Sequence, residues 1–251
     1  MRTIICALFI SIFSVSLVHA ETQVQRLLAA YESVTNLTLE IRRDTPLDGG
    51  KNIRMLSRVY FQRPDKLHVE NFSPVKRRTI SDGAVFRQYT EGASKGFSRP
   101  VEKLDATMLT NLRMLPGSNA NFLEPLRELE EVAVAPTAEF PLRVGYDNAG
   151  KSFTVLSFDS ANRLAKFEIF SSPDMTDSHI TAVYSNFQEV APNVWLARTQ
   201  EQTVIMQGFT RRESVRLDTI SATAPIPASL FDASAFFKNV EFVDSFDKIV
   251  E

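Results

Sequence analysis

Few side chains in this sequence are of the types that carry out enzymatic chemistry. The chain has one cysteine, Cys6, and three histidines. Cys6 and His19 lie in the apolar N-terminal segment, which leaves only His68 and His179 for the folded protein. These two are far apart in sequence and lack the short spacing of paired metal ligands. We therefore expect each to be a surface or strand-edge residue, and we expect no metal site.

The run Asp177-Ser178-His179 contains the three residue types of a serine hydrolase. Catalytic triads, however, are assembled from residues spread through the chain, and a strained turn of the G-x-S-x-G type presents the serine. Ser178 does not lie in such a turn. We expect the run to be an ordinary turn, and we expect the chain not to be an enzyme.

Two clusters of charged residues have a solvated surface as their simplest interpretation. Glu128, Glu130 and Glu131 could act as paired carboxylates, but we expect them on the polar side of a short helix. The basic run at 76–78 (KRR) has no aromatic residues at the spacing that stacked bases need, so it is expected to be a charged strand edge. The sequence thus indicates no nucleic-acid partner and no cofactor.

The first 20 residues have the pattern of a secretory signal peptide. Arg2 supplies a positive start, an apolar run follows from Ile4 to Leu17, and small residues precede the expected cleavage site after Ala20. We therefore expect residues 1–20 to be a signal peptide and residues 21–251 to form one domain. Cys6 precedes the cleavage site, so the exported protein is expected to have no disulfide and no lipid anchor. The formal net charge of the whole chain is −2, which argues against a general affinity for polyanions.

The domain is expected to begin with one amphipathic helix over residues 22–34. Thr22 can cap it, and its apolar positions recur at three- and four-residue spacing at Val24, Leu27, Leu28, Tyr31 and Val34. From Leu37 the period changes to two, and the turn-forming residues at 46–50 (PLDGG) follow. This pattern predicts a long β-hairpin after the helix.

The strands that follow alternate between apolar and polar residues. Val59 and Phe61 share one face with Met55, and after the break at Pro64 the apolar positions are Leu67 and Val69. The same alternation returns in strands near residues 167, 195 and 216. One antiparallel sheet of many strands, with one apolar face and one polar face, is the simplest interpretation.

Two short helices are expected to interrupt the sheet, over residues 105–115 and 122–129. The first has apolar residues at Leu104, Met108, Leu112 and Leu115, and the second has Pro125 in its first turn. Together with the first helix they have only one large apolar surface on which to pack, the concave side of a curved sheet. The expected fold class is α+β and mostly β: a half-open barrel whose concave face is covered by the N-terminal helix and short lid helices.

Several motifs, in order along the chain, resemble the periplasmic lipoprotein carrier family, LolA and its relatives. They are the run at 59–69 (VYFQRPDKLHV), Pro74, the segment 80–83 (ISDG) leading to Tyr89, the hairpin at 156–169 and the segment 226–231 (IPASLF). The resemblance spans most of residues 21–235. It implies a half-barrel with an apolar cavity for acyl chains, in a soluble periplasmic protein that shuttles lipoproteins towards the outer membrane.

The resemblance also implies roles for particular residues. The arginine before the proline lies at the mouth of the cavity in this family and bonds to the lid backbone, so Arg63 is the expected lid latch. The expected cavity lining is Val59, Phe61, Leu67, Val69, Met108 and Leu112. The implied partners are an acylated lipoprotein or lipid, an inner-membrane release complex and an outer-membrane receptor, and we expect a monomer.

The sequence also differs from the better-known members of that family. Leu67 and Val69 stand where large aromatic residues are common, and the segment from Phe236 to Glu251 is an addition with its own apolar face. The cargo could therefore be a free lipid or glycolipid. A sensor module of envelope stress and an enzyme acting on an envelope lipid are the remaining alternatives.

Overall fold

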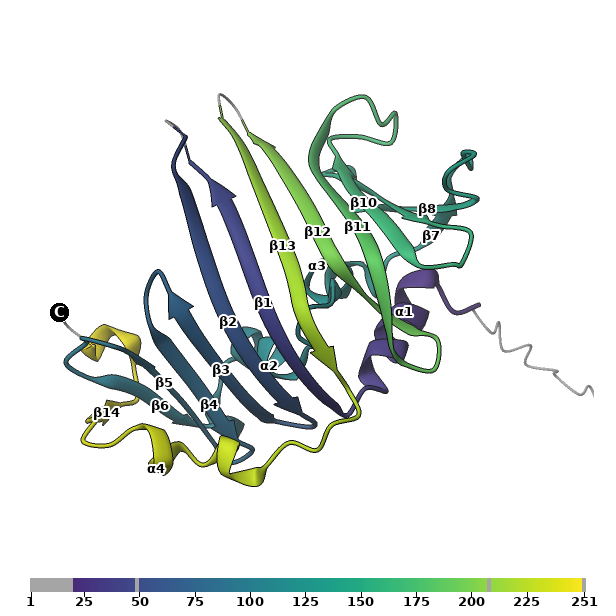
Figure 1. Ribbon diagram of the computed structural model, residues 1–251. Coiled ribbons are helices and arrows are strands. Elements are labelled where there is room, and N and C mark those ends of the chain that lie inside the picture. The colour runs from purple at the N-terminus through teal and green to yellow at the C-terminus, as the bar shows by residue number, and fades with distance from the viewer. Residues whose placement is uncertain (1–19, 48–49, 207–208, 250–251) are drawn as a thin grey trace, which may run out of the picture.

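A single, strongly curved β-sheet dominates this computed structural model, and the helices α1, α2 and α3 lie on one face of it (Figure 1). The structure describes residues 20–47, 50–206 and 209–249, so the expected signal peptide falls almost wholly outside the described residues. The strands are β1 (Asn36–Pro46), β2 (Asn52–Gln62), β3 (Lys66–Ser73), β4 (Arg77–Asp82), β5 (Val85–Thr90), β6 (Gly96–Pro100), β7 (Glu131–Ala133), β8 (Leu142–Asp147), β9 (Phe153–Phe158), β10 (Leu164–Phe170), β11 (Ser178–Ala191), β12 (Val194–Met206), β13 (Phe209–Ser221) and β14 (Phe242–Val243).

The helices are few and short. They are α1 (Gln23–Glu32), α2 (Ala106–Arg113), α3 (Ala120–Leu123) and α4 (Ala233–Phe236), with the 3-10 turns η2 (Val101–Lys103), η3 (Glu124–Leu126), η4 (Ala228–Phe231) and η5 (Phe246–Lys248). The sheet order is β14-β6-β5-β4-β3-β2-β1-β13-β12-β11-β10-β9-β8-β7, so the described sheet is open rather than closed into a barrel. This architecture confirms the expected mostly-β, half-open fold.

Helix α1 forms where the sequence predicts it. The Thr22 side chain accepts a hydrogen bond from the backbone N–H of Gln25, and the Gln25 side chain accepts one from the N–H of Thr22, which completes a capping box. Val24, Leu28 and Tyr31 are buried on its inner side. The helix is thereby packed against the concave face of the sheet.

The centre of the concave face is built from paired apolar residues of neighbouring strands. In the β1–β2 hairpin Leu37 pairs with Phe61 and Leu39 with Val59, and all four are almost completely buried. Such cross-strand pairs stabilise a sheet when they pack under a covering element. Here α1 and α3 supply that cover.

Helix α2 covers the concave face of β3, β5 and β6. Asp105 caps it by accepting a hydrogen bond from the N–H of Met108 at 2.8 Å. Its inner residue Leu112 packs with Phe86, Phe97 and other apolar side chains in a second core cluster. The third expected helix, over 122–129, is replaced by the shorter α3 and η3, because Pro125 in the first turn of η3 leaves no donor to continue an α-helix.

The expectation that the other face of the sheet is polar is wrong in two places. On the convex side of β9, Phe153 and Val155 are buried against Phe170 and Val134. On the convex side of β3 and β4, His68 and Ile80 pair across the strands and are both buried. The alternation of a strand shows which residues face the main core, but a distant segment can cover the other face as well.

The segment after β13 covers the convex side of β3 and β4 and then crosses to the concave side. We call residues 222–249 the C-terminal strap. Figure 1 shows it in yellow, passing along the ends of the strands to the outer edge of β6. Phe236 lies over His68 with 4.8 Å between ring centroids. Strand β14 then pairs in parallel with β6, and the ring of Phe246 stacks on Phe97 at 4.1 Å. Gly96 allows this approach, because a Cβ atom there would lie 2.5 Å from the Phe242 ring.

Candidate functional site

Arg63 lies where β2, α1 and α2 meet. Its guanidinium donates three hydrogen bonds to backbone carbonyl oxygens: Nε to Val34 at 3.0 Å, Nη2 to Tyr31 at 3.1 Å and Nη1 to Arg113 at 2.9 Å. Tyr31 lies in the last turn of α1, and Arg113 is the last residue of α2. Carbonyl oxygens at a helix C-terminus have no partner within the helix and carry partial negative charge, so a guanidinium suits them.

The cation of Arg63 is also packed against an aromatic ring. Its guanidinium carbon lies 5.3 Å from the centroid of Phe61, which places the side chain on the concave face of β2. Burial lowers the pKa of Arg63, but arginine still remains charged at neutral pH. Arg63 thus bonds to the backbone of α2, and its function as the latch that the resemblance implies stays a prediction.

A second contact to α2 was missed in the sequence. Asp65 is buried, and its carboxylate accepts two hydrogen bonds from the Arg113 guanidinium, at 2.7 and 3.1 Å. Ser81 fixes the backbone of this turn by donating to the carbonyl oxygen of Asp65 at 2.6 Å. Both the carbonyl and the side chain of Arg113 are thus bound to one short turn.

A cavity of about 390 Å³ opens among the helices beside these contacts. Arg63 and Arg113 lie on its wall together with Leu28, Met114 and Leu115. The three helices are therefore separated by a space next to the Arg63 hydrogen bonds.

The six residues expected to line an acyl-chain cavity are packed in this structure. Val59 and Phe61 belong to the main core, and Leu67 and Val69 pack against it. Leu112 belongs to the cluster under α2, with Met108 against it. None of these six residues lines any of the cavities described here. Their role in acyl-chain binding stays a prediction, and it would require α2 to move away from the sheet.

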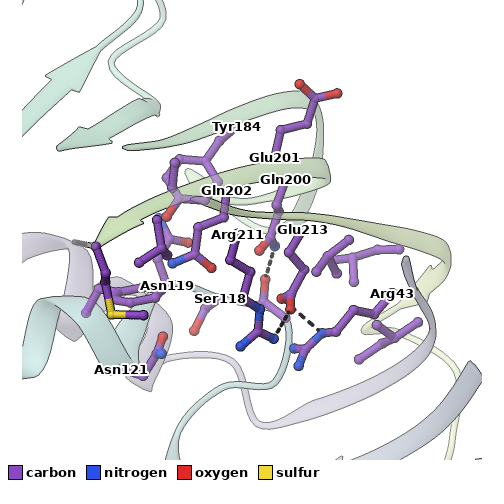
Figure 2. A pocket seen from close by; sticks show the side chains of 18 residues that line it. Arg43, Ser118, Asn119, Asn121, Tyr184, Gln200, Glu201, Gln202, Arg211 and Glu213 are labelled. Atoms are coloured by element: carbon purple, nitrogen blue, oxygen red, sulfur yellow. Dashed lines mark hydrogen bonds and ion pairs between the residues drawn. The ribbon is translucent and has the colours of Figure 1, made fainter. Parts of the chain in front are cut away.

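Another cavity lies on the concave face of the second half of the sheet (Figure 2). Its volume is about 430 Å³, and its walls come from β1, β11, β12 and β13 and from the segment 117–122. Two arginines, Arg43 and Arg211, point at the carboxylate of Glu213. The amide of Gln200 donates to the carbonyl oxygen of Gly117 at 2.8 Å and closes one side. This cavity was not expected from the sequence, because its residues are distant along the chain.

The residues first considered for chemistry are not brought together. His179 lies on β11, where its Nε2 atom is 2.7 Å from the Ser171 hydroxyl, while Ser178 bonds to Ile180 and Thr181. The expected surface position of His68 is wrong: it is 1% exposed, because the C-terminal strap covers it. The described residues hold no group of three or more histidine, cysteine or carboxylate side chains placed to bind a metal ion.

The expected solvated position of Glu131 is also wrong. Its carboxylate accepts hydrogen bonds from the N–H of Gln23 and from the Tyr146 hydroxyl, both at 2.5 Å. It thus binds the N-terminus of α1, where a negative charge is favoured. The helix expected over 122–129 ends at Leu126 in the structure. Glu131 instead begins strand β7.

The basic run and one overlooked pattern also have structural positions. Arg78 pairs with Glu70 and Lys76 pairs with Glu91, so the basic run lies at a charged surface. Residues 92–96 (GASKG) fit G-x-S-x-G, but they join the two strands of the β5–β6 hairpin. A nucleophile elbow needs a strand followed by a helix, so this segment is not one.

No described helix is long enough and apolar enough to cross a membrane. No family model matches the chain, and no curated protein sequence matches it. Solved structures do match. An outer membrane lipoprotein-sorting protein domain from Vibrio parahaemolyticus has a TM-score of 0.52 and 11% identity, over 85% of this chain and 96% of that one.

Two further structures match to the same degree. A LolA superfamily protein from Nitrosomonas europaea has a TM-score of 0.50 and 10% identity, over 83% of this chain and 96% of its own. A DUF1329 family protein from Desulfovibrio piger has a TM-score of 0.52 and 11% identity, over 86% of this chain and 96% of its own. At this identity the likeness concerns the fold. The chain therefore has the fold of the LolA superfamily and of lipoprotein-sorting domains.

Proposed function

We propose that the protein is a periplasmic carrier that binds the acyl chains of a lipoprotein or lipid on its concave face and moves them towards the outer membrane. The observation that carries the proposal is the fastening of α2. Its inner side packs through apolar residues, and its C-terminal end is bound through Arg113 to the turn of Arg63 and Asp65. Loss of these polar contacts would leave α2 held by its apolar packing alone.

The surface beneath α2 suits acyl chains once the helix has moved. It consists of apolar residues such as Leu67, Phe86 and Phe97. Each methylene group removed from water contributes roughly 0.8 kcal/mol, so an acyl chain could replace the contacts that α2 gives up. A carrier must also hide this surface when empty, because large exposed apolar patches cause aggregation.

Copurification tests this function directly. The full chain with its own leader is produced in a Gram-negative host, purified from the periplasm without detergent and examined by mass spectrometry. A copurified acylated protein supports carriage of lipoproteins, and copurified lipid supports a lipid shuttle. A preparation without any acylated molecule would contradict the proposal and favour a sensor or structural role.

Arg63→Leu tests the latch. We expect the variant to bind acyl ligands and to transfer them poorly to acceptor vesicles. Without the Arg63 hydrogen bonds the closed position of α2 is less stable relative to the open one, so closure of the helix would no longer favour release of the ligand. Arg26→Leu is the matched control, since Arg26 lies on α1 and its guanidinium donates to the carbonyl oxygen of Glu21, away from α2. Normal transfer by Arg63→Leu would contradict the latch.

A further inference from the structure

The cavity over β1, β11, β12 and β13 carries an excess of positive charge. The Nε atom of Arg43 lies 3.3 Å from one oxygen of Glu213, and Nη2 of Arg211 lies 2.9 Å from the other. Glu213 is only 12% exposed and holds both cations in place. Glu201 also borders the cavity, but its carboxylate points away from the other charged groups (Figure 2). One carboxylate therefore faces two guanidinium groups, which leaves a net charge of about +1.

Both arginines retain hydrogen-bond donors for a ligand. A guanidinium has five N–H donors, and the contact with Glu213 uses Nε of Arg43 and Nη2 of Arg211. Within the described residues, no partner is found for the Nη groups of Arg43 or for Nη1 of Arg211. Planar forks of this kind bind phosphate oxygens two at a time.

Neutral donors line the same space. Gln202 and Asn119 lie on its wall, as does Tyr184. Burial raises the pKa of Tyr184, so its phenol stays protonated and can donate a hydrogen bond. Charged and neutral donors thus surround one cavity whose size is typical of small-molecule sites.

The cavity changes character along its length. On the concave face of β13, the residues from the helices towards the hairpin turn are Leu217, Val215, Glu213 and Arg211, and on β1 they are Ile41 and Arg43. Phe122 of α3 adds an aromatic ring at the end near the helices. On β1 and β13 the floor is therefore apolar near the helices and cationic towards the hairpin turn, while on β12 Gln200 and Gln202 lie nearer the helices and Val204 and Met206 lie nearer the turn. A molecule that fits this gradient has an anionic head and an apolar tail.

We propose that this cavity binds an amphiphile with a phosphate headgroup, with the phosphate on Arg43 and Arg211 and the acyl chain directed towards α3. The inference rests on the proposed function, since it assumes that the concave face takes acyl chains. It also narrows the cargo. The acylated N-terminus of a lipoprotein carries no phosphate, so this site favours an anionic phospholipid or phosphorylated glycolipid.

Calorimetric titration of the delipidated full chain tests the site. The probes are dioctanoyl phosphatidylglycerol, dioctanoylglycerol, which has the same chains without the phosphate, and inorganic phosphate. We expect the wild type to bind the phospholipid at least about tenfold more tightly than dioctanoylglycerol, as a charge-assisted contact to phosphate implies. The double variant Arg43→Gln/Arg211→Gln should lose this preference and keep its affinity for dioctanoylglycerol.

The matched control is Arg42→Gln/Arg212→Gln. Each of these arginines is the neighbour of a cavity arginine, and each faces the convex side because successive residues of a strand alternate. The control removes the same charge and should keep the full preference. Equal melting temperatures would show that both double variants are folded.

The outcomes separate this inference from the carrier proposal. If the wild type binds both lipids equally, or if Arg43→Gln/Arg211→Gln keeps the preference, the headgroup site is wrong and the carrier proposal stands. If neither lipid binds, both are wrong. If inorganic phosphate binds as tightly as the phospholipid, the site takes free phosphate, and the assignment to a lipid is wrong.

Discussion

The two halves of the concave face share one sheet but are filled differently. Over β3, β5 and β6 the space is occupied by α2 and, at the edge, by Ile249 of the C-terminal strap. Over β11, β12 and β13 the cover consists of α1 and the single turn of α3, and a cavity of about 430 Å³ remains beside α3. The sheet alone therefore does not decide where a ligand can bind in this fold. The place where the covering helices lie on the sheet matters as well.

The arginines of the two halves differ in the same way. Arg63 donates to three carbonyl oxygens and is used within the protein. Arg43 and Arg211 share one carboxylate and keep donors facing the cavity. An arginine whose donors are used within the protein supports its structure, and an arginine with spare donors in a cavity is available for an anionic ligand.

Truncation of a core side chain should give the largest difference between the two halves. Phe97→Ala, under α2, removes a ring that is 1% exposed, and we expect it to lower the free energy of unfolding by about 3–5 kcal/mol. Val204→Ala, on the cavity wall, should cost roughly 1 kcal/mol or less, because the cavity already borders this side chain. Urea unfolding followed by circular dichroism measures both. Equal losses would show that the two halves are packed alike.

Loss of the Arg63 hydrogen bonds should have a smaller and more local effect. We expect Arg63→Leu to lower the free energy of unfolding by about 2 kcal/mol, since hydrogen bonds to charged groups contribute roughly 1.5–3 kcal/mol and leucine keeps part of the packing. Amide hydrogen exchange should become faster in α2 than in β11–β13. A uniform increase across the whole sheet would show that Arg63 supports the entire fold rather than the covering helix.

Acidification should act on the filled half through His68. Burial, and next the charge of Arg78, lowers the pKa of His68 to about 4, whereas an unfolded chain holds histidine near 6.5. The unfolded state therefore binds more protons between these values. Neutral His68 therefore makes its full contribution to the free energy of unfolding above about pH 6.5. This contribution decreases as the pH falls towards 4, by at most about 1.4 kcal/mol per pH unit.

Unfolding in urea at several pH values measures this dependence. His68→Phe should make the slope between pH 6.5 and 4 smaller, and His179→Gln, which changes an exposed histidine, should leave it as it is. An unchanged slope in His68→Phe would show that carboxylates elsewhere cause the acid sensitivity.

Much of the framework follows from local sequence patterns. Helix α1, the β1–β2 hairpin and the start of α2 at Asp105 depend on capping residues and on periodicity, which are encoded within a few positions. The strand face of Arg63 follows from its alternation with Val59 and Phe61, whereas its role as a latch rests on family resemblance and stays a prediction.

The remaining features depend on contacts between distant segments. His68 is buried by Phe236, Glu131 binds the start of α1, and the cavity joins Arg43 to Arg211. Nothing in the immediate neighbourhood of these residues encodes such contacts. The aromatic-rich tail beyond Phe231 was the available signal, because so many apolar residues in a terminal segment must pack against some surface.

The ends of the sheet have a further consequence for the protein in a crowded compartment. A wide open sheet presents two rows of unpaired backbone groups, and these can recruit strands from other molecules. In the described sheet one border is the two-residue β14, seated against Gly96, and the other is the three-residue β7. Borders this short offer few hydrogen bonds to an incoming chain. The C-terminal strap thus shortens the edge that β6 would otherwise offer to another strand.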